Sequence, residues 1–502
     1  MRLRRRFACP DPRPNPAATA LWRRLLDDHH LGGARFAEGE SFAAELRLGV
    51  PAVKRGCYGL SLVELMIAMV LGLLVSAGIV AVFASTSNTH LAQEQLALLQ
   101  EEGRFAITQI SNDLAMAGAQ YCTGTGGMAY QSAAGPYLDG LRAPTVYARD
   151  ADLLMQALSD VTTPWGGAYP AEPREPYSLP SFLAMRGYDC TASRCSPVDP
   201  SDKRNREGFN IPAMGKGVDS RVIGASVLTV RYLKPAGGWA INLEEDGAQG
   251  STLLGNADGS VTVRLHPLPG EPKASDVKKD APLVMLADCF SAQIFAVRGM
   301  GSSQLVSTGN NFTQPHVFQN MAVPRLFSLS RDLQTVTYFL KVVDNGDGMG
   351  HATGALVRRV NGGDKARGGT GEEIARGVER LDFKYGVQGA DGTVRYYTAE
   401  QVDNSTRSDC PALPLPMAGG NDRGCLWRSV GLIEIDLLMS GQNPLYSLTP
   451  GELAYSYASD GIAAPASPVA NGRKVTPAQQ GFPLQVLRRE FTAVVAVRNA
   501  NP

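Results

Sequence analysis

The sequence predicts an α+β protein in which a long N-terminal helix packs against antiparallel β-sheets. No proline occurs between Leu60 and Gln120, a stretch that begins with an uncharged apolar run and continues with amphipathic spacing. The rest of the chain carries short segments rich in Val, Ile, Tyr and Phe, separated by loops rich in Gly and Pro. Because the apolar residues lie on one side in both parts, we expect the helix and the strands to cover each other.

The composition is that of a globular protein with one large or two modest cores. The chain has 502 residues, 44% of them apolar, with 48 basic and 48 acidic residues. A neutral chain without a long Lys/Arg run after residue 60 lacks the cationic surface that phosphate binding needs. We therefore expect no nucleic-acid partner. The first 59 residues are basic, with 11 Lys/Arg against 6 Asp/Glu.

The first element is an apolar run that follows Lys54 and Arg55. The 19 residues from Leu65 to Phe83 carry no charge. A helix of this length, at about 1.5 Å per residue, spans about 30 Å of bilayer hydrocarbon, and the basic residues ahead of it favour a cytoplasmic N-terminus. We expect residues 60–84 to cross the membrane, with the rest of the chain on the outer side.

A secretory signal peptide is the alternative, because Val82-Phe83-Ala84 offers small residues at a usable cleavage position. An ordinary signal core has about 7 to 15 apolar residues, however, fewer than this run contains. Glu64 also lies just inside the apolar run, where a charged group costs roughly 2.5 to 3.5 kcal/mol. That carboxylate needs a partner or a function.

The helix is predicted to continue over residues 85–119. The apolar residues there recur at spacings of three, four and seven and form one face: Leu96, Leu99, Ala106, Ile110, Leu114 and Ala117. Gly118 can end the helix as its C-cap. A helix from Leu60 to Gly118 is roughly 90 Å long, too long for one membrane crossing. Its second half must therefore pack on something outside the membrane.

Residues 120–502 are predicted to form a β-rich globular region. In the last candidate strand the odd-numbered residues from Phe491 to Val497 alternate with Thr492, Val494 and Ala496. In the preceding candidate, Leu432, Ile435 and Leu437 are flanked by Glu434 and Asp436, which indicates sheets with one covered face. The nine candidates are Val227–Tyr232, Leu283–Leu286, Gln293–Val297, Val336–Val343, Ala355–Val360, Leu381–Val387, Thr393–Tyr397, Gly431–Met439 and Phe491–Val497.

Residues 123–222 and 398–428 are interpreted as loops, because they are rich in Gly and Pro. The first range is a candidate insertion, either a small subdomain or a set of surface loops. The segment Asp344–Gly350 is similar to a calcium loop but lacks the spacing and the distal Glu of an EF-hand. A hairpin turn at Asn345-Gly346 or Asp347-Gly348 is favoured there.

The N-terminal motif resembles the class III signal of type IV prepilins. The residues G-L-S-L-V-E-L-M, from Gly59 to Met66, stand directly before the apolar run. The resemblance implies that a prepilin peptidase cuts after Gly59, removing residues 1–59 as a basic leader. Leu60, where the family usually has Phe, would become the N-methylated terminus, and Glu64 would be the fifth mature residue.

The resemblance also implies a role for Glu64 in assembly. Its carboxylate would offset the N-terminal amine of a neighbouring subunit when helices bundle, so that two costly charges become one contact that sets the register. An incidental acid at the bilayer surface is the alternative. Leaders of this family are short, so we hypothesise that translation starts downstream, for example at Val50 or Val53.

Further segments resemble PilW-type minor pilins. Leu96–Ile107 (LALLQEEGRFAI) and Asp113–Gly118 (DLAMAG) are similar to the helix of that family. The segments VLTVRY, VMLADC, GVERLDFKYGV and RREFTAVVAVRN resemble its strands in the expected order. The resemblance implies a pilin-like fold with large loop insertions, and a minor pilin that primes type IV pilus assembly or sits in the pilus tip complex. It implies as partners the prepilin peptidase, other minor pilins, the major pilin, a large tip adhesin and the inner membrane.

Six cysteines lie beyond the apolar run and would meet an oxidising compartment, where disulfides form. Proximity in sequence favours pairing Cys190 with Cys195 and Cys410 with Cys425, which leaves Cys122 to Cys289. A zinc site is the alternative, but the sequence has no CxxC pair and no His near these cysteines.

We expect no enzyme and no cofactor. The sequence has no GxSxG elbow, HExxH helix, Walker loop or dinucleotide fingerprint, and its histidines are scattered. Two other functions compete with the minor pilin. One is a minor pseudopilin of a type II secretion system, and the other is an adhesin-like, membrane-tethered module whose loops bind a surface. A pilin of this kind would sit in the inner membrane with its C-terminal domain in the periplasm, and later in the pilus tip or fibre at the cell surface.

Overall fold

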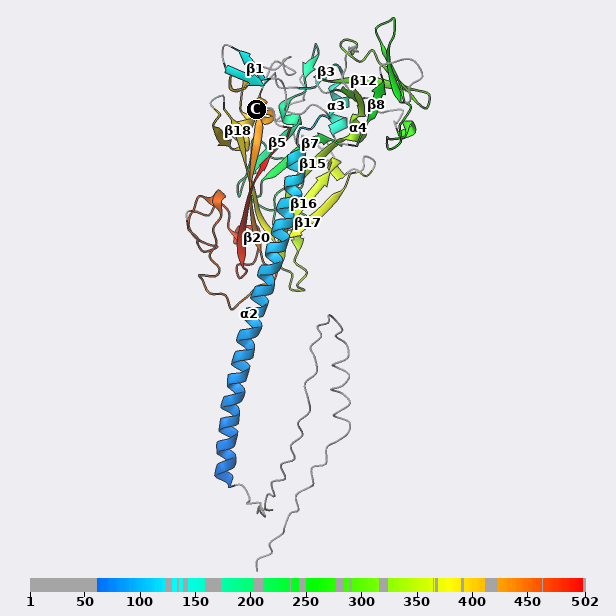
Figure 1. Cartoon of the computed structure of the whole chain (residues 1–502). Helices are drawn as coiled ribbons and strands as arrows, with labels where there is room; N and C mark the ends of the chain where they lie inside the picture. The colour runs from blue at the N-terminus through cyan, green and yellow to red at the C-terminus, as the bar shows by residue number, and fades with distance from the viewer. Residues whose placement is uncertain are drawn as a thin grey trace, which may run out of the picture. The chain divides into compact units, whose positions relative to one another are not determined.

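The computed structural model describes most of the chain from Ser61 onward (Figure 1). The described residues are 61–121, 129–132, 135–138, 143–158, 173–201, 211–234, 236–242, 250–276, 283–288, 291–315, 324–363, 365, 369–389, 392–410, 423–462 and 464–499. Residues 1–75 and 76–502 form two compact units. The described residues of the first unit are Ser61 and the beginning of helix α2.

Helix α2 (Leu62–Met116) is one continuous helix of 55 residues, as predicted. Two residues after its end, Gly118 has φ 72°, the left-handed conformation that glycine adopts without strain. The apolar face predicted for the second half is confirmed, because all but one of its members are buried and Leu96 is half-buried. The second half of α2 is thus a core element.

One side of helix α2 packs against an antiparallel six-stranded sheet. Its strands, in spatial order, are β17 (Gly371–Arg376), β16 (Ala352–Val360), β15 (Leu333–Asp344), β7 (Val227–Leu233), β5 (Met185–Cys190) and β6 (Cys195–Ser196). The predicted hairpin is confirmed: Asp344 of β15 pairs with Ala352 of β16, and Gly346, Gly348 and Gly350 in the loop have positive φ. Among the described residues, no cluster of potential metal ligands occurs in this loop or elsewhere.

A second, four-stranded antiparallel sheet is formed by the C-terminal part of the chain. Its order is β19 (Val394–Tyr397), β18 (Val378–Gln388), β20 (Val430–Ser440) and β21 (Arg488–Ala496). The predicted alternation in β21 is confirmed, since Thr492, Val494 and Ala496 are exposed. The predicted place of Leu432 beside Ile435 and Leu437 is wrong. Leu432 lies on the same face as Glu434 and Asp436, and Ile433 is the residue that is buried with Ile435 and Leu437.

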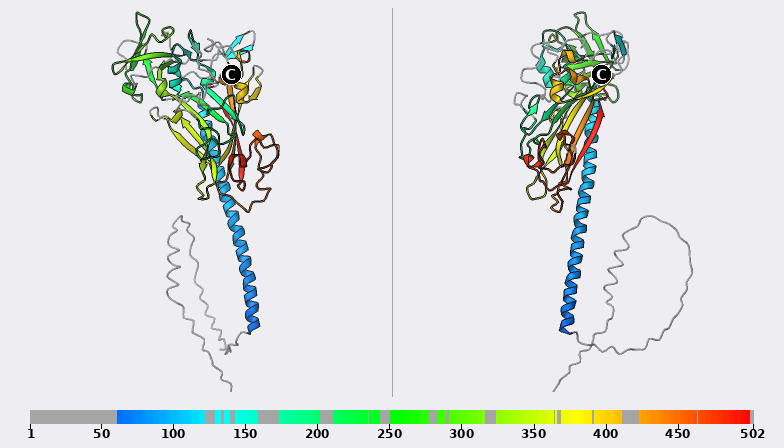
Figure 2. Two further views of the ribbon diagram at one scale, coloured as in Figure 1. Left: turned by 180° about the vertical axis from the view of Figure 1, so that it is seen from behind. Right: turned by 90° about the vertical axis from the view of Figure 1, so that its left-hand side faces the viewer.

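The main core lies between α2 and the two sheets. Apolar residues of α2, β7, β15, β18 and β20 belong to one buried cluster. β21 follows the second half of α2 in both views of Figure 2, and the Arg498 N–H donates to the Ala115 carbonyl at 3.3 Å. The helix therefore packs against antiparallel sheets, which confirms the predicted α+β architecture.

The described residues between Trp239 and Ser328 form a lobe with its own core, which we call the inserted lobe. Together with the short β3 (Thr145–Val146) and β4 (Tyr177–Ser178), its strands make a nine-stranded sheet in which an additional pairing of β11 with β12 closes seven strands into a ring. Those seven, in order around the ring, are β11 (Leu283–Ala287), β14 (Arg325–Ser328), β8 (Trp239–Asn242), β9 (Ser251–Gly255), β10 (Val261–Arg264), β13 (Gln304–Ser307) and β12 (Ala292–Met300). Trp239, Phe295 and ten aliphatic residues fill its interior.

The two chain connections between the inserted lobe and the six-stranded sheet lie next to each other. The chain leaves that sheet after Leu233 at the end of β7 and returns at Leu333 at the start of β15, and these two residues are register partners. β11 contributes alternately to both cores, because Met285 faces the main core and Val284 and Leu286 face the lobe core.

The loop interpretation of residues 123–222 and 398–428 is wrong in part. The first range holds the hairpin β1 (Ala129–Ser132) and β2 (Gly135–Leu138), the strands β3 to β6 and helix α3 (Ala151–Leu158). The second holds α5 (Ala399–Asp403), which starts at a capping box of Thr398 and Gln401. Most of these strands have two to four residues, too few to show a period. Two further short helices are α4 (Leu329–Asp332) and α6 (Pro477–Gln480).

Candidate assembly site

The N-terminal end of α2 is closed by a capping box of Ser61 and Glu64. The Ser61 backbone N–H donates to Glu64 Oε2 at 2.9 Å, and the Glu64 N–H donates to Ser61 Oγ at 3.2 Å. Each side chain thus satisfies a backbone N–H that the first turn leaves without an intrahelical partner. Gly59 and Leu60, the expected cleavage residues, lie outside the described residues.

The first part of α2 presents an apolar surface that no other described residue covers. All side chains from Leu62 to His90 are exposed, among them fifteen large apolar ones from Leu62 to Phe83. In the described part of the chain, α2 is the one helix long and apolar enough to cross a membrane. An apolar surface of this size needs a bilayer or other apolar helices around it.

Gly103 allows α2 to pack closely against the four-stranded sheet. A Cβ added at Gly103 would lie 2.5 to 2.7 Å from three ring carbons of Phe491 in β21, closer than real side chains approach. Eight residues earlier in the helix, Gln95 Oε1 accepts the Gln442 N–H at 3.1 Å. Asn345 Nδ2 in the β15–β16 loop donates in turn to the Gln442 carbonyl.

A buried carboxylate joins α2 to the six-stranded sheet. Asp113, 7% exposed, accepts hydrogen bonds from Tyr232 Oη at 2.6 Å in β7 and from Tyr338 Oη at 2.5 Å in β15. Arg358 of β16 binds it in a bidentate manner, through Nε at 2.6 Å and Nη2 at 3.1 Å. Burial, and then the Asp113 charge, raise the pKa of both tyrosines, which remain neutral donors.

Sequence reasoning missed the role of Asp113. A signal was available, because Asp113 follows Ile110 by three residues and Ala106 by seven, so that it falls on the predicted apolar face. An acid in that position requires a buried partner. The partners themselves come from three strands that are 119 to 245 residues away along the chain.

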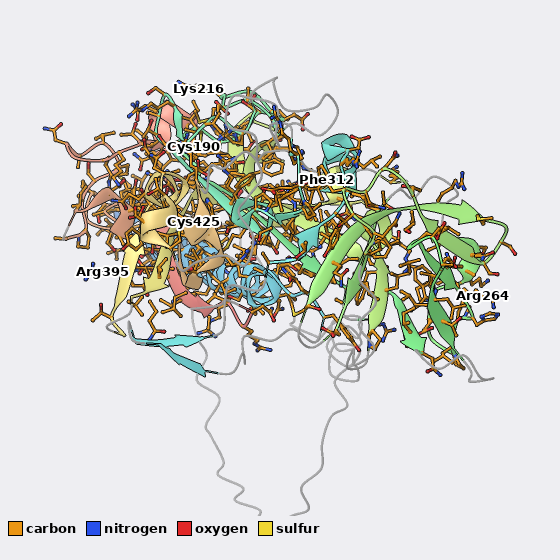
Figure 3. All side chains as sticks on the ribbon, turned by 90° about the horizontal axis from the view of Figure 1, so that it is seen from above. Cys190, Lys216, Arg264, Phe312, Arg395 and Cys425 are labelled. Carbon is orange, nitrogen blue, oxygen red and sulfur yellow. A yellow bond between two sulfur atoms is a disulfide. The ribbon has the colours of Figure 1, made fainter. Side chains whose placement is uncertain are left out.

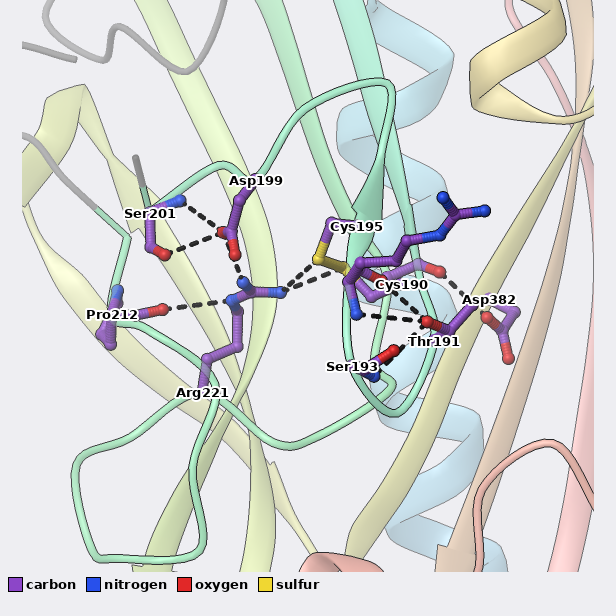
Figure 4. Close-up of a disulfide and its surroundings, with 11 residues drawn as sticks. Cys190, Thr191, Ser193, Cys195, Asp199, Ser201, Pro212, Arg221 and Asp382 are labelled. Carbon is purple, nitrogen blue, oxygen red and sulfur yellow. Dashed lines mark hydrogen bonds and ion pairs between the residues drawn. A yellow bond between two sulfur atoms is a disulfide. The ribbon is translucent and has the colours of Figure 1, made fainter. Parts of the chain in front are cut away.

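The structure contains the disulfides Cys190–Cys195 and Cys410–Cys425, while Cys122 and Cys289 lie outside the described residues. Cys190–Cys195 closes the β5–β6 hairpin (Figure 4). The buried Arg221 donates from Nη1 to Cys190 Sγ at 3.0 Å, and from Nη2 to Asp199 at 2.9 Å. Figure 3 shows Cys190 and Cys425 in the part of the domain away from Arg264 of the inserted lobe.

Buried ion pairs fasten the segment between β20 and β21. Arg488, at the start of β21, contacts both carboxylate oxygens of Glu379 at 2.7 and 3.0 Å, and both side chains are at most 1% exposed. Asp460 binds Arg380 at 3.2 Å and Arg473 at 3.0 Å. These pairs were not foreseen, because the segment between the two strands shows no periodicity.

Two parts of the chain, one near its beginning and one in its C-terminal part, match known protein families. Residues 54–80 match the prokaryotic N-terminal methylation motif, and residues 337–499 match the family of the type IV pilus-assembly protein W, PilW. No curated protein and no solved structure matches the chain. The PilW match covers most of β15, the strands that follow and the whole four-stranded sheet, and leaves the inserted lobe outside.

The two matches confirm the resemblances read from the sequence. The methylation motif spans Gly59, Leu60 and Glu64, which implies processing by a prepilin peptidase, and the PilW domain implies pilin partners. An apolar helix behind such a motif suggests anchoring in the inner membrane before assembly. The chain therefore carries a PilW-family type IV pilus-assembly domain behind a class III prepilin motif, and this combination marks a non-enzymatic, pilin-like assembly protein.

Proposed function

We propose that this protein is a minor pilin that primes type IV pilus assembly and sits in the pilus tip complex. The observation that carries the proposal is a single helix with two environments. Its first part is apolar, capped by Ser61 and Glu64 and exposed, and its second part is the core element of a PilW-type β-domain. A chain built in this way suits a membrane tether that later becomes part of a fibre.

Before assembly, the protein crosses the inner membrane once, with residues 120–502 in the periplasm. After cleavage behind Gly59, it moves into the pilus tip or fibre at the cell surface. Its partners are other minor pilins, the major pilin and a large tip adhesin. The PilW match supports this role over a minor pseudopilin of a secretion system and over an adhesin-like, membrane-tethered module whose loops bind a surface.

The capping box refines the role that we propose for Glu64. Oε2 is engaged by Ser61, the second residue of the mature chain, and this bond fixes the carboxylate at the start of the helix. The second oxygen, Oε1, is then in position to accept the Leu60 amine of a neighbouring subunit. Such a contact would offset one buried charge with another and set the register between two helices.

The first prediction concerns the charge of Glu64. Deleting the protein should lower the number of surface pili, and the wild-type chain should restore it. Glu64→Gln should be cleaved and inserted but fail to restore pili, because the amide keeps a cap without the charge. Pili are counted by electron microscopy, and incorporation is measured by immunoblot of sheared fibres.

Ser61→Ala is the matched control for Glu64→Gln. This change removes the cap, worth about 1 kcal/mol, and keeps the charge, so pili should form. Normal pili in the deletion strain would contradict the proposed function, and a loss of protein secretion in place of pili would point to the pseudopilus. Normal incorporation of Glu64→Gln would contradict the charge pairing alone.

The second prediction concerns cleavage. Gly59→Leu should block removal of the leader, because a branched side chain at the cleavage position crowds the peptidase site. The uncleaved protein should then stay in the inner membrane. Intact-mass measurement and N-terminal sequencing of the membrane fraction check this, with Gly56→Ala in the leader as a control that should be cleaved normally. Mature protein that begins at Ser85 would refute the assignment of the motif.

A further inference from the structure

The C-terminal strand β21 is an open edge of the four-stranded sheet. The Leu487 carbonyl accepts the Gly441 N–H, and the Val497 N–H donates to Gly431, so the odd-numbered residues of β21 bond to β20. Glu490, Thr492, Val494 and Ala496 therefore direct their backbone N–H and C=O groups away from β20. In the described part of the structure, none of these groups makes a hydrogen bond.

The other described edges of the two main sheets are guarded against pairing. β17 carries Glu372, Glu373 and Arg376 and lies beside a register irregularity at Leu356/Val357. β19 has four residues, and β6 has two and is closed by a disulfide. Charges, irregular register and short length are the devices by which proteins prevent edge pairing.

β21 has none of these protections over its central part. It has nine residues, and the six from Phe491 to Ala496 are uncharged, free of proline and rich in β-branched and aromatic side chains. Such an edge pairs readily with another strand and is an aggregation hazard in an isolated protein. An exposed edge of this kind is consistent with a strand that is covered after assembly.

We infer that the β21 edge is the docking site for an extended strand of a different pilin subunit, which adds to the sheet through main-chain hydrogen bonds from Glu490 to Ala496. This inference rests on the proposed function. The uncharged run lies between Glu490 and Arg498, so the added strand should be uncharged at its centre. A basic residue opposite Glu490 and an acidic one opposite Arg498 would fix its register.

The surroundings of the edge also fit an added strand. Val494 is 54% exposed and offers an apolar contact for a side chain of the partner. Beside the first half of β21 lies a cavity of about 440 Å³ lined by Tyr455, Pro465, Glu490 and Thr492, among others. In strand addition, pockets of this kind receive alternate side chains and give the contact its specificity.

A second copy of this chain is a poorer occupant. α2 and β21 run in the same direction, because Gly103 packs on Phe491 and Ala115 bonds to Arg498 further along both elements. Antiparallel pairing of two β21 strands would therefore direct the two helices oppositely, which chains inserted from the same side of one membrane cannot do. Parallel pairing of two β21 strands would keep the two helices in the same direction, but a parallel ladder is slightly less stable per residue than an antiparallel one.

The test uses the full chain in inner membranes, co-expressed with the other pilin subunits of the same organism. A photo-crosslinking amino acid at Thr492 should join the chain to a strand of another pilin, identified by mass spectrometry. Val494→Pro removes an outward N–H, which an edge strand tolerates in its own sheet, and should lower the yield about tenfold. Val494→Thr keeps that N–H and should leave the yield unchanged.

Formation of the Cys410–Cys425 disulfide and resistance to protease show whether a variant is folded. If Val494→Pro fails this check, Val494→Lys replaces it, since Val494 is exposed and an edge lysine opposes pairing. No crosslink, a crosslink insensitive to both variants, or a crosslink to a second copy would overturn the inference. Normal pili from a folded Val494→Pro chain would also overturn it, while the pilus loss on deletion would still support the function.

Discussion

Asp113→Ala is expected to destabilise the globular region by about 3 to 5 kcal/mol, the range found when one partner of a buried ion pair is removed. The change leaves the Arg358 guanidinium and two tyrosine hydroxyls without their common acceptor. It also removes the contacts by which Asp113 joins α2 to the strands β7, β15 and β16. The shift should appear in the thermal unfolding of the detergent-solubilised full chain, followed by loss of tyrosine near-UV signal.

Two substitutions separate this role of Asp113 from a general sensitivity of the helix. Asp113→Asn keeps an acceptor for the tyrosines but removes the charge opposite Arg358, so it should cost less than alanine. Asn112→Ala, one residue earlier on the exposed side of α2, should change stability by less than about 0.5 kcal/mol. An Asp113→Ala protein as stable as the Asn112→Ala protein would show that the carboxylate does not hold the helix.

Arg488→Met is expected to have an effect of similar size, about 3 to 5 kcal/mol. The Glu379 carboxylate would remain buried at 1% exposure without its counter-charge. Three backbone carbonyls between Pro483 and Val486 would also lose their guanidinium donor. Because Arg488 begins β21, we expect protease cleavage between β20 and β21 to increase along with the loss of stability.

The neighbouring residue provides the control for Arg488. Arg489→Met removes an exposed arginine from the same strand and should be nearly neutral. The double variant Glu379→Leu, Arg488→Met removes both buried charges and should recover most of the lost stability, since an apolar pair can replace a buried ion pair. A double variant as unstable as Arg488→Met would mean that the backbone contacts of Arg488 outweigh its charge.

The helix and the long strands could be predicted from sequence because their patterns are local. α2 shows its period over several turns, and all nine candidate strands are present as strands. Two strands of the inserted lobe, β11 and β12, were among the candidates. The ring itself could not be predicted, because it depends on the pairing of β11 with β12 and on the parallel pairing of β8 with β9. Such closures depend on contacts between distant parts of the chain.

The residues of the candidate site also fall into two groups: those that a local motif reveals and those that only the fold brings together. The motif from Gly59 to Glu64 is contiguous, so its resemblance to a prepilin signal could be recognised from the residues alone. The anchors of the helix were not, because Gly103 matters only beside Phe491 and Asp113 only beside Arg358. The open edge of β21 is a property of the sheet order, which no single segment encodes.

The point at which the inserted lobe joins the six-stranded sheet has a consequence for variation among related chains. Leu233 and Leu333 are partners in adjacent strands, so the chain between them, residues 234–332, starts and finishes at almost the same place. Chain length can be gained or lost in the part of the lobe away from the main core without displacing Tyr232, Tyr338 or Arg358, whereas β11 also lines the main core. Variation of the outer part of the lobe is thereby uncoupled from the Asp113 contacts that join α2 to the six-stranded sheet.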